Sequence, residues 1–480
     1  MIRSNKTVNE GVRFGLLSHD QMQDIHNSVL DIMENIGMHV QSKKAINILQ
    51  QAGARVEGSL VKLPSYLVEN ALVSVPSRIV LWDRDGNQKI NLSGYNSYFG
   101  PGSSNVYIMD PYTGERRRPT STDTINAMRV VDALPNIDFA TDFGTISDAP
   151  VETNDLHLLK IMMNNTRKPI LHWAKNLKNQ MAMTEMVAAV SGGLDSFVER
   201  PSVCWFTTAV SPLIQTEEAI ECLMYCAENM IPNCHVSAPM SGGTSPVTGA
   251  GTVALSLAET MFGVVLSQLV RKGAPCFMGC VDGPIDMKTM IMSYGNPEFQ
   301  LMNAAFAEMG HYYNIPTWGA SGCTDAKVVD QQAAIEAAFS IMTQSFVGAN
   351  LISDNGFLEG GTLESMEQLA MCDEIIGYAR RLLMGLTITD ESLATDVIGQ
   401  AGPRGNYFDK DHTFKHFREL WRPTLLDRNK YDVWVKDGKT TMGERLNAKV
   451  KYLIDNHSPQ AILPDEINLK LARIIAAAES

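Results

Sequence analysis

Hydrophobic and polar positions follow two different rhythms along the chain, and the change comes near residue 100. In the first part, apolar residues recur at helical spacing in SHDQMQDIHNSVLDIMENIG, which predicts an amphipathic helix from Ser18 to a stop at Gly37. A second helical pattern, KKAINILQQAG, follows, and then come the short strand-like pieces VKLPS and RIVLWDRDGN. We therefore expect residues 1–100 to form an N-terminal segment of helices and short strands without a catalytic signature.

After residue 100, short apolar runs rich in β-branched or aromatic residues recur, separated by glycine-rich or polar residues and by helical patterns. Strand, loop and helix repeated about eight times is typical of a parallel sheet with covering helices, and eight units favour a closed barrel. The sequence therefore predicts an α/β fold, a (β/α)8 TIM barrel over residues 101–400. The predicted strands are FATDFGTI (139–146), PILHWA (169–174), SVCWFTTAV (202–210), NCHVSAPM (233–240), APCFMGCV (274–281), IPTWGAS (315–321), GANLISDNG (348–356) and LTITDESLA (386–394).

The tail over residues 401–480 differs again, with clustered aromatic and charged residues in GNYFDKDHTFKHFRELWRPTLLDR and a last helix that ends in RIIAAAES. We interpret it as a C-terminal helical extension that packs on the barrel and is available for a subunit contact. Large apolar barrels often self-associate, so we expect a homo-oligomer.

Composition and charge exclude several classes of function. Hydrophobic residues make up 45% of the chain and charged residues 19%, which is enough apolar material for a large core. The net charge of -13 argues against nucleic-acid binding, which needs a basic surface. No apolar run looks long enough to span a membrane and the start has no signal-peptide core, so we expect a cytoplasmic enzyme. The eight cysteines are scattered through apolar segments and are expected to be buried free thiols.

In a barrel of this kind the working residues lie at the carboxyl ends of the strands. This rule selects His172 and Trp173, the hydroxyls Thr207 and Thr208, and Ser321 with the acids that follow later strands. The glycine-rich loop SGGTSPVTGAG (241–251) lacks the lysine of a P-loop, which argues against nucleotide triphosphate binding. Its first residues, Ser241, Gly242 and Gly243, either admit a bulky cofactor or simply form a flexible loop at the mouth.

Four stretches resemble the trimethylamine methyltransferase family. They are YFGPGSSNVYIMDPYTGERRRPT (98–120), PMSGGTSPVTGAGTVALSLAET (239–260), SYGNPEFQ with GASGCTDAKVVDQQAAIEA (293–338), and DHTFKHFRELWRP in the tail. The resemblance covers most of the chain, from about residue 15 to residue 460, and the combination is specific although each piece alone is weak. It implies a TIM barrel and methyl transfer to a corrinoid (cobalamin-type) cofactor carried by a partner protein, with no cofactor tightly bound and no metal site.

One departure from the family changes the expected substrate. Members that act on trimethylamine carry pyrrolysine just after a strand-six segment that corresponds to TDAKVVD here, so Val328, give or take one residue, stands at that position. A valine cannot form the adduct proposed for pyrrolysine. The branch without pyrrolysine includes enzymes that demethylate glycine betaine and related quaternary amines, and this chain resembles that branch.

The expected chemistry defines the candidate site. A quaternary nitrogen can leave as a neutral tertiary amine, and Co(I) is itself a strong nucleophile, so the pocket mainly positions the donor. Aromatic faces suit the ammonium, although each aromatic residue is equally able to fill the core. A substrate carboxylate needs donors such as His172, Lys175, Ser321 or backbone amides. The candidates for substrate binding are Phe99, Tyr107, Trp173, Trp205, Trp318, Ser321 and Phe357.

The resemblance also places Asp325 and Glu298 in matching stretches, and with His172 they form the candidate catalytic set. A structural ion pair is the alternative role for both acids. Two other functions stay open: a metal-dependent lyase or hydrolase that uses Asp282, Asp286 and His172, and a non-catalytic protein that binds quaternary amines.

Overall fold

The barrel is formed by short parallel strands whose apolar residues are buried on both faces. In the computed structural model, which describes residues 11–460 and 462–480, seven strands pair in the order β6-β18-β17-β14-β12-β10-β9, all in parallel. Such strands are read from sequence as nearly continuous apolar runs, as predicted. Their bounds are β6 (Tyr98–Pro101), β9 (Ile170–Trp173), β10 (Val203–Thr208), β12 (Asn233–Ser237), β14 (Cys276–Cys280), β17 (Thr317–Ala320) and β18 (Leu351–Asn355).

Residues 138–141 close the barrel between its two remaining edges. The Asp138 N–H donates to the Phe99 carbonyl of β6 (2.6 Å), and the Leu171 N–H of β9 donates to the Ala140 carbonyl (2.9 Å). Ala140 also forms a parallel bridge with Ile170. This segment follows β6 in the sequence, so the fold is a (β/α)8 barrel that begins at β6.

The predicted eighth strand, 386–394, is wrong. That segment contains the short helix α13 (Asp390–Leu393) and pairs with no strand. The alternating β-branched residues of LTIT resemble a strand, but a parallel strand exists only where a neighbour accepts its hydrogen bonds. The true first strand, YFGP, is short and holds a glycine and a proline, which hid it from the pattern. It lies across residue 100, where the N-terminal segment was expected to end.

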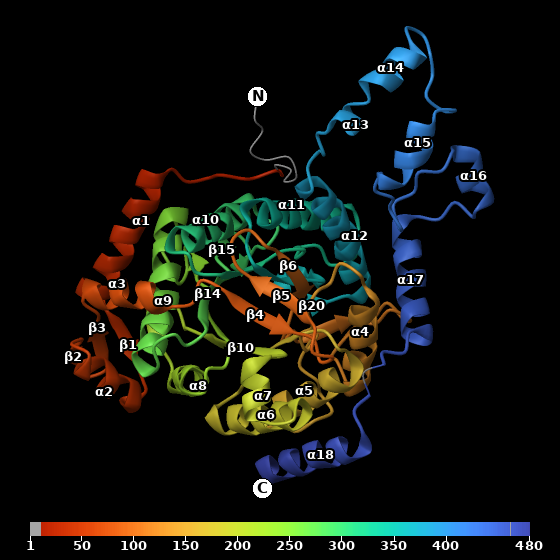
Figure 1. The fold of residues 1–480 in the computed structure, drawn as a ribbon. Coiled ribbons are helices and arrows are strands. Elements are labelled where there is room, and N and C mark those ends of the chain that lie inside the picture. Colours follow the sequence, from red (N-terminus) through yellow and green to blue (C-terminus); the bar gives the residue numbers. More distant parts are fainter. Residues whose placement is uncertain (1–10, 461) are drawn as a thin grey trace.

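A helix follows each barrel strand and covers the outside of the sheet (Figure 1). Several helices begin after a short polar side chain that accepts a backbone N–H of the first turn, as expected of N-cap residues. These N-caps are Asn176, Thr216, Ser42 and Ser365. The covering helices are α4 (Ser121–Ala133), α5 (Asn154–Asn165), α6 (Leu177–Ser191), α8 (Glu217–Glu228), α9 (Gly249–Val270), α10 (Pro297–Tyr313), α11 (Gln331–Val347) and α12 (Met366–Leu383).

The N-terminal segment folds over one side and one end of the barrel. Its first helix, α1 (His19–Asp31), has the expected N-cap at Ser18, and its last turn becomes a π-helix that stops at Gly37. The hairpin of β4 (Ile79–Trp82) and β5 (Gln88–Leu92) lies across the amino-terminal ends of the strands (Figure 1). The remaining elements are β1 (Met38–Val40), α2 (Lys43–Gln51), β2 (Arg55–Glu57), β3 (Leu60–Lys62) and α3 (Ser65–Ser74), and β1 pairs with the barrel-loop strand β11 (Ile214–Gln215).

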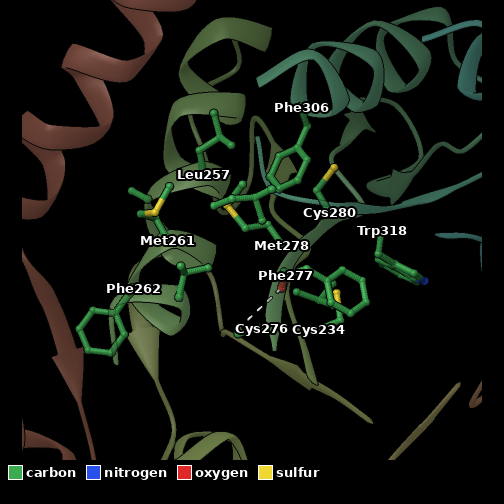
Figure 2. Close-up of a cluster of buried hydrophobic side chains, with 14 of the residues drawn as sticks. Cys234, Leu257, Met261, Phe262, Cys276, Phe277, Met278, Cys280, Phe306 and Trp318 are labelled. Carbon is green, nitrogen blue, oxygen red and sulfur yellow. Dashed lines mark hydrogen bonds between the residues drawn. The ribbon is translucent and has the colours of Figure 1, made fainter. Parts of the chain in front are cut away.

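Helix α9 is apolar on every face because it is covered on every face. Figure 2 shows Leu257 directed toward Met278 of β14 and Phe306 of α10, whereas Phe262 lies on the opposite side of the helix. Helices α1, α2 and α3 pack against that outer side. The expectation that no run reaches membrane-spanning length is wrong for α9, which passes by length and composition, but 89% of its apolar window is buried inside the protein. All eight cysteines are buried free thiols, as predicted.

The chain after α12 leaves the barrel and returns to it. Three short helices, α13, α14 (Thr395–Ala401) and α15 (Asp411–His416), project from the body in Figure 1, and α16 (Tyr431–Lys436) follows. Helix α17 (Met442–Asn456) then packs on α4 and α12, and α18 (Asp465–Glu479) packs on α5 and α6.

Candidate active site

A cavity of about 610 Å³ opens at the carboxyl ends of the barrel strands, where the fold places active sites. Its volume falls within the roughly 300–1,000 Å³ usual for small-molecule sites. A larger cavity, of about 1030 Å³, lies between the end of α12 and the C-terminal segment, away from the strand ends. We therefore take the cavity at the mouth as the candidate active site. Its walls include Ser103, Ser104, Asn105, Thr145, Trp173, Lys175, Phe206, Thr207, Thr208, Glu218, Tyr294, Trp318, Asp354 and Phe357.

Five aromatic side chains form much of the wall. Phe206 of β10 and Trp318 of β17 are stacked, with their planes 11° apart and their centroids 6.4 Å apart. Tyr294 meets Phe357 edge to face at 6.4 Å. The fifth, Trp173, is fixed at its polar end by a hydrogen bond from the indole N–H to Asp142 (2.6 Å). These rings line the cavity, and the faces of aromatic rings attract cations.

Three buried carboxyl groups lie beside this wall. Asp354 lines the cavity in a left-handed backbone conformation (φ 67°), and burial raises the pKa of its carboxyl to about 7 although Ser353 donates to it (2.8 Å). Glu364, of β20 (Leu363–Glu364), is fully buried, and burial followed by the nearby Asp142 and Asp354 holds its pKa well above the usual range. The nearest donors, at Gly102 and Asn105, lower that pKa only in part, and neither Glu364 oxygen has a hydrogen-bond partner of normal geometry.

The acids at the mouth lie apart from the lysines and arginines of the described residues. Among residues 11–460 and 462–480, no lysine or arginine forms an ion pair with Asp142, Asp354 or Glu364. Lys175, at the cavity wall, pairs instead with Glu152 at 2.7 Å. Buried charges are normally paired, so a group of acids with no cation beside it is prepared to accept a cation from outside.

The candidate catalytic set is not brought together. His172 is fully buried, and its Nε2 donates to the Asp155 backbone carbonyl (2.9 Å), which can only accept; its Nδ1 lies 3.9 Å from Asp142. Asp325 accepts from Ser293 and from the N–H groups of Tyr294 (3.0 Å) and Gly295 (3.1 Å), so it ties two mouth loops together. Glu298 is exposed in the first turn of α10.

The substrate-binding candidates divide into two groups. Trp173, Trp318 and Phe357 line the cavity. The other four lie outside its lining: Phe99 and Trp205 pack in the layer between strands and helices, Tyr107 lies under the Arg116 guanidinium (3.4 Å), and Ser321 donates to Asn355 (3.1 Å).

The glycine-rich loop packs against a neighbouring hairpin. Ser241 donates to the Val247 carbonyl (3.0 Å), and a side chain at Gly242 or Gly243 would collide with Met287 or Ile285 of the loop that follows β14. These glycines therefore allow close packing of two mouth loops. Val328, at the position expected for pyrrolysine, is exposed on the loop between β17 and α11.

The residues proposed for the metal-dependent alternative do not share one environment. Asp282 is fully buried, whereas Asp286 is exposed and accepts the Lys288 N–H (2.7 Å) within its own turn. In the part of the chain that the structure describes, no group of three or more histidines, cysteines or acids is placed to hold a metal ion.

Sequence reasoning missed Phe206, Tyr294, Asp142 and Glu364. For Phe206 a signal existed: side chains alternate along a strand, so Trp205 and Phe206 must face opposite sides, and the structure directs Phe206 into the mouth. Asp142 lies inside the predicted strand 139–146, so the strand-end rule did not select it. Tyr294 and Glu364 lie on loops and small strands whose positions only the folded chain defines.

The chain matches a known family over almost its whole length. A model of the family described as trimethylamine methyltransferase (MTTB) matches residues 2–479. The chain is 34% identical to trimethylamine methyltransferase MttB of Desulfitobacterium hafniense strain DCB-2, over 100% of this chain and 98% of the relative. It is 31% identical to the glycine betaine methyltransferase of Desulfitobacterium hafniense strain Y51, over 97% of both chains.

A solved structure supports the fold. The monomethylamine methyltransferase MtmB of Methanosarcina barkeri superposes with a TM-score of 0.51, at 13% identity, over 91% of this chain and 92% of that one. At this identity the likeness shows the barrel architecture alone.

Proposed function

Because the chain belongs to the trimethylamine methyltransferase (MTTB) family and is a methyltransferase, we propose that its methyl donor is a quaternary amine of the betaine type. The proposed acceptor is the Co(I) corrinoid of a partner protein. We further propose that the enzyme acts in the cytoplasm.

The observation that carries the proposal is the combination of an aromatic wall with buried acids that have no lysine or arginine partner among the described residues. Trp318, Phe206 and Phe357 offer π-faces, and Asp354 offers a carboxylate on the same cavity. A tetra-substituted ammonium has no N–H to donate, so cation–π contacts and a nearby carboxylate are the contacts open to it. The positive charge of the substrate would also favour the ionised form of Asp354.

The charge of the substrate falls during the reaction, and this limits how strongly the pocket should hold it. Methyl transfer from a quaternary nitrogen leaves a neutral tertiary amine, so a site that binds the full cation too tightly slows the step. A single carboxylate with a pKa near neutrality is a moderate counter-ion rather than a strong one. The chain needs no residue with the chemistry of pyrrolysine, because the donor is activated by its permanent charge.

The carboxylate end of a betaine needs donors, and the cavity offers some. The Trp318 indole N–H and the Asn105 amide NH₂ are buried, and neither has a hydrogen-bond partner of normal geometry. Lys175 adds a positive charge at the wall, shared with Glu152. We propose these three groups, in place of His172 and Ser321, as the carboxylate contacts.

The corrinoid, when bound, supplies the Co(I) nucleophile, and the chain provides access and alignment. The cavity opens at the barrel mouth, so a cofactor presented by another protein would meet the donor there. This chain's tasks are to hold the donor methyl toward that opening, to keep Trp173 in place through Asp142, and to release a neutral amine. The second expected partner is another copy of this chain, and we propose that it binds at a surface other than the cavity mouth.

The test uses the purified enzyme with chemically reduced cob(I)alamin as acceptor and a panel of donors: glycine betaine, proline betaine, carnitine, butyrobetaine and trimethylamine. We expect loss of the Co(I) absorbance and formation of methyl-cobalt with at least one betaine, release of the matching demethylated amine, and no reaction with trimethylamine. Binding of every betaine without methyl-cobalt, with a corrinoid protein present as well, would support a sensor instead. Methyl-cobalt from trimethylamine alone would refute the assignment of the donor.

A further inference from the structure

Three loops at the barrel mouth meet at Asp325. Two of them carry an aromatic residue of the cavity wall, Tyr294 in the first loop and Phe357 in the third. The bonds around Asp325 therefore bear on the shape of the cavity. The three loops are residues 293–296, between β16 (Ile291–Met292) and α10; residues 321–330, between β17 and α11; and residues 357–362, after β18.

The Asp325 carboxylate holds the first loop through three donors. One oxygen accepts the Tyr294 N–H (3.0 Å). The other oxygen accepts the Gly295 N–H (3.1 Å) and the Ser293 hydroxyl. A carboxylate accepts on both oxygens at once, whereas a side-chain amide has a single acceptor oxygen. The residue type therefore matters, because two adjacent backbone N–H groups are held by the two oxygens of one side chain.

The second loop is itself held to the third loop and to α11. The Thr324 N–H donates to the Phe357 carbonyl (3.2 Å), and the Gly360 N–H donates to the Thr324 carbonyl (3.0 Å). On its other side, the Glu336 carboxylate of α11 accepts the Asp325 N–H (2.8 Å) and the Thr324 hydroxyl. Asp325 therefore connects the first loop to a part of the mouth that is already fixed to the barrel.

The ring of Tyr294 has little freedom to move independently of its backbone. It meets Phe357 edge to face at 6.4 Å between centroids, and its centroid lies 4.9 Å from that of Phe299. It also lies against Gly361, where an added Cβ atom would be only 3.0 Å from the ring. Tyr294 is 8% exposed. The place of the ring in the wall therefore follows its backbone, which Asp325 holds.

We propose that Asp325 is a positioning residue for the methyl donor and that it acts through Tyr294. The role rests on the proposed function, in which the aromatic wall binds a quaternary ammonium. The Asp325 side chain is outside the lining of the cavity, so it acts on the donor indirectly. Cation–π attraction requires the cation within about 6 Å of the ring centroid. A misplacement of about 1 Å can also cost roughly 100-fold in rate, so the position of the ring affects both binding and transfer.

A matched pair of substitutions on one loop tests this role. Asp325→Asn leaves at least one of the N–H groups of Tyr294 and Gly295 without an acceptor. Asp330→Asn is the control, because the exposed Asp330 accepts one N–H at the start of α11, that of Ala333 (3.1 Å). Asparagine caps a helix as well as aspartate does. Each variant keeps the size of the side chain and removes one negative charge.

Calorimetric titration with tetramethylammonium, a quaternary ammonium without a carboxylate, reports on the ammonium end of the site. Asp325→Asn is expected to raise its dissociation constant by about 3- to 10-fold. The same variant is expected to lower kcat for transfer from glycine betaine to cob(I)alamin by on the order of 10-fold. Asp330→Asn is expected to change each value by less than about 2-fold. If Asp325→Asn keeps both values and only unfolds at a lower urea concentration, its role is structural alone and the proposal is overturned.

A second substitution tests whether Asp325 acts through Tyr294. In a Tyr294→Leu background, Asp325→Asn is expected to change the dissociation constant of tetramethylammonium by less than about 2-fold, because the ring that it positions is absent. The two substitutions are then non-additive, as expected of residues that act as one unit. An undiminished effect in that background would mean that Asp325 reaches the donor by another route, and it overturns the proposal.

Near-ultraviolet circular dichroism separates a failure of this proposal from a failure of the proposed function, because the signal of an aromatic ring depends on fixed packing and not on a ligand. Asp325→Asn is expected to change the spectrum of the wild type and to leave that of Tyr294→Leu unchanged. If the wild type binds neither tetramethylammonium nor glycine betaine, the proposed function fails, and the spectra still decide whether Asp325 positions the ring. Identical spectra of Asp325→Asn and the wild type overturn the positioning role.

Discussion

The two ends of the barrel treat buried charge in opposite ways. At the amino-terminal end, the Lys168 ammonium donates to three backbone carbonyls, of Val131 (2.6 Å), Leu134 (2.8 Å) and Ile137 (2.6 Å). Nearby, Arg380 donates to Asp138 at 2.6 Å. At the carboxyl end, Asp354, Glu364 and Asp142 share no lysine or arginine partner among the described residues.

The difference shows which end supports the fold and which end acts on a substrate. Charges that are paired within the chain contribute to the folded state and offer nothing to a ligand. Acids left unpaired make the folded state less stable, and a ligand that brings the opposite charge recovers that free energy. The hairpin of β4 and β5 covers the amino-terminal end of the barrel, where the Arg84 N–H donates to the Arg167 carbonyl (3.0 Å). The carboxyl end, which holds the unpaired acids, opens into the cavity.

The largest expected effect comes from removing a paired charge. Lys168→Met leaves three buried carbonyls without their donor and removes a positive charge near Asp138, and we expect it to lower the free energy of unfolding by about 3–5 kcal/mol. Urea unfolding measures the change. Lys272→Met, at an exposed lysine, should change it by less than about 0.5 kcal/mol. Equal effects of the two substitutions would contradict the comparison.

Removing an unpaired acid should have the opposite sign. Burial raises the pKa of Asp354 from 3.8 to about 7, so its stability contribution is full below about pH 4 and is lost as the pH rises through 7. Asp354→Asn should therefore be more stable than the wild type by about 2–4 kcal/mol at pH 8, and nearly equal to it at pH 4. Unfolding curves at both pH values check this, and a less stable variant at pH 8 would argue against an uncompensated acid.

The same substitution should weaken substrate binding. Loss of a charged contact is worth about 1.5–3 kcal/mol, so Asp354→Asn is expected to raise the dissociation constant for glycine betaine by about 10- to 150-fold. In the wild type, affinity should increase as the pH rises through about 7, because Asp354 ionises there. Calorimetric titration at pH 6 and pH 8 measures both effects. Asp195→Asn, at an exposed acid on α7 (Leu194–Glu199), is the control, and a pH-independent wild type would exclude Asp354 as the counter-ion.

The smallest expected effect separates two neighbours on one strand. Phe206→Leu removes a ring from the cavity wall and should weaken binding by about 0.5–2 kcal/mol, or roughly 2- to 30-fold. Trp205→Phe changes a residue in the layer between strands and helices, so it should lower stability and leave the affinity unchanged. The reverse result would mean that β10 presents its other face to the mouth.

Much of the fold could be predicted because parallel strands and their helices have simple patterns. Six predicted runs contain barrel strands, and 139–146 contributes the closing segment. The error at 386–394 has a physical cause, since a strand is defined by its neighbours and LTITDESLA has none. The four residues of β6 are a strand only because β18 lies beside them.

The candidate site was harder to predict because it depends on which way each side chain points. The strand-end rule found Trp173, and the expected contact of aromatic faces with an ammonium added Trp318 and Phe357. The rule also selected His172 and Ser321, which lie on the same strands but bond inside the wall. Asp325 and Glu298 were selected by similarity to a family. Such similarity does not distinguish a residue that holds two loops together from one that contacts the substrate.

Helix α9 sets a limit on how the protein can be divided. Its outer side is covered by α1, α2 and α3. A barrel expressed without the first hundred residues would therefore expose the apolar outer side of this 22-residue helix to the solvent. During synthesis the covering helices leave the ribosome first and must wait for α9. We expect that the N-terminal segment covers this helix as soon as it emerges and so protects it from aggregation. The segment is therefore needed for folding of the barrel and cannot be removed without loss of the folded protein.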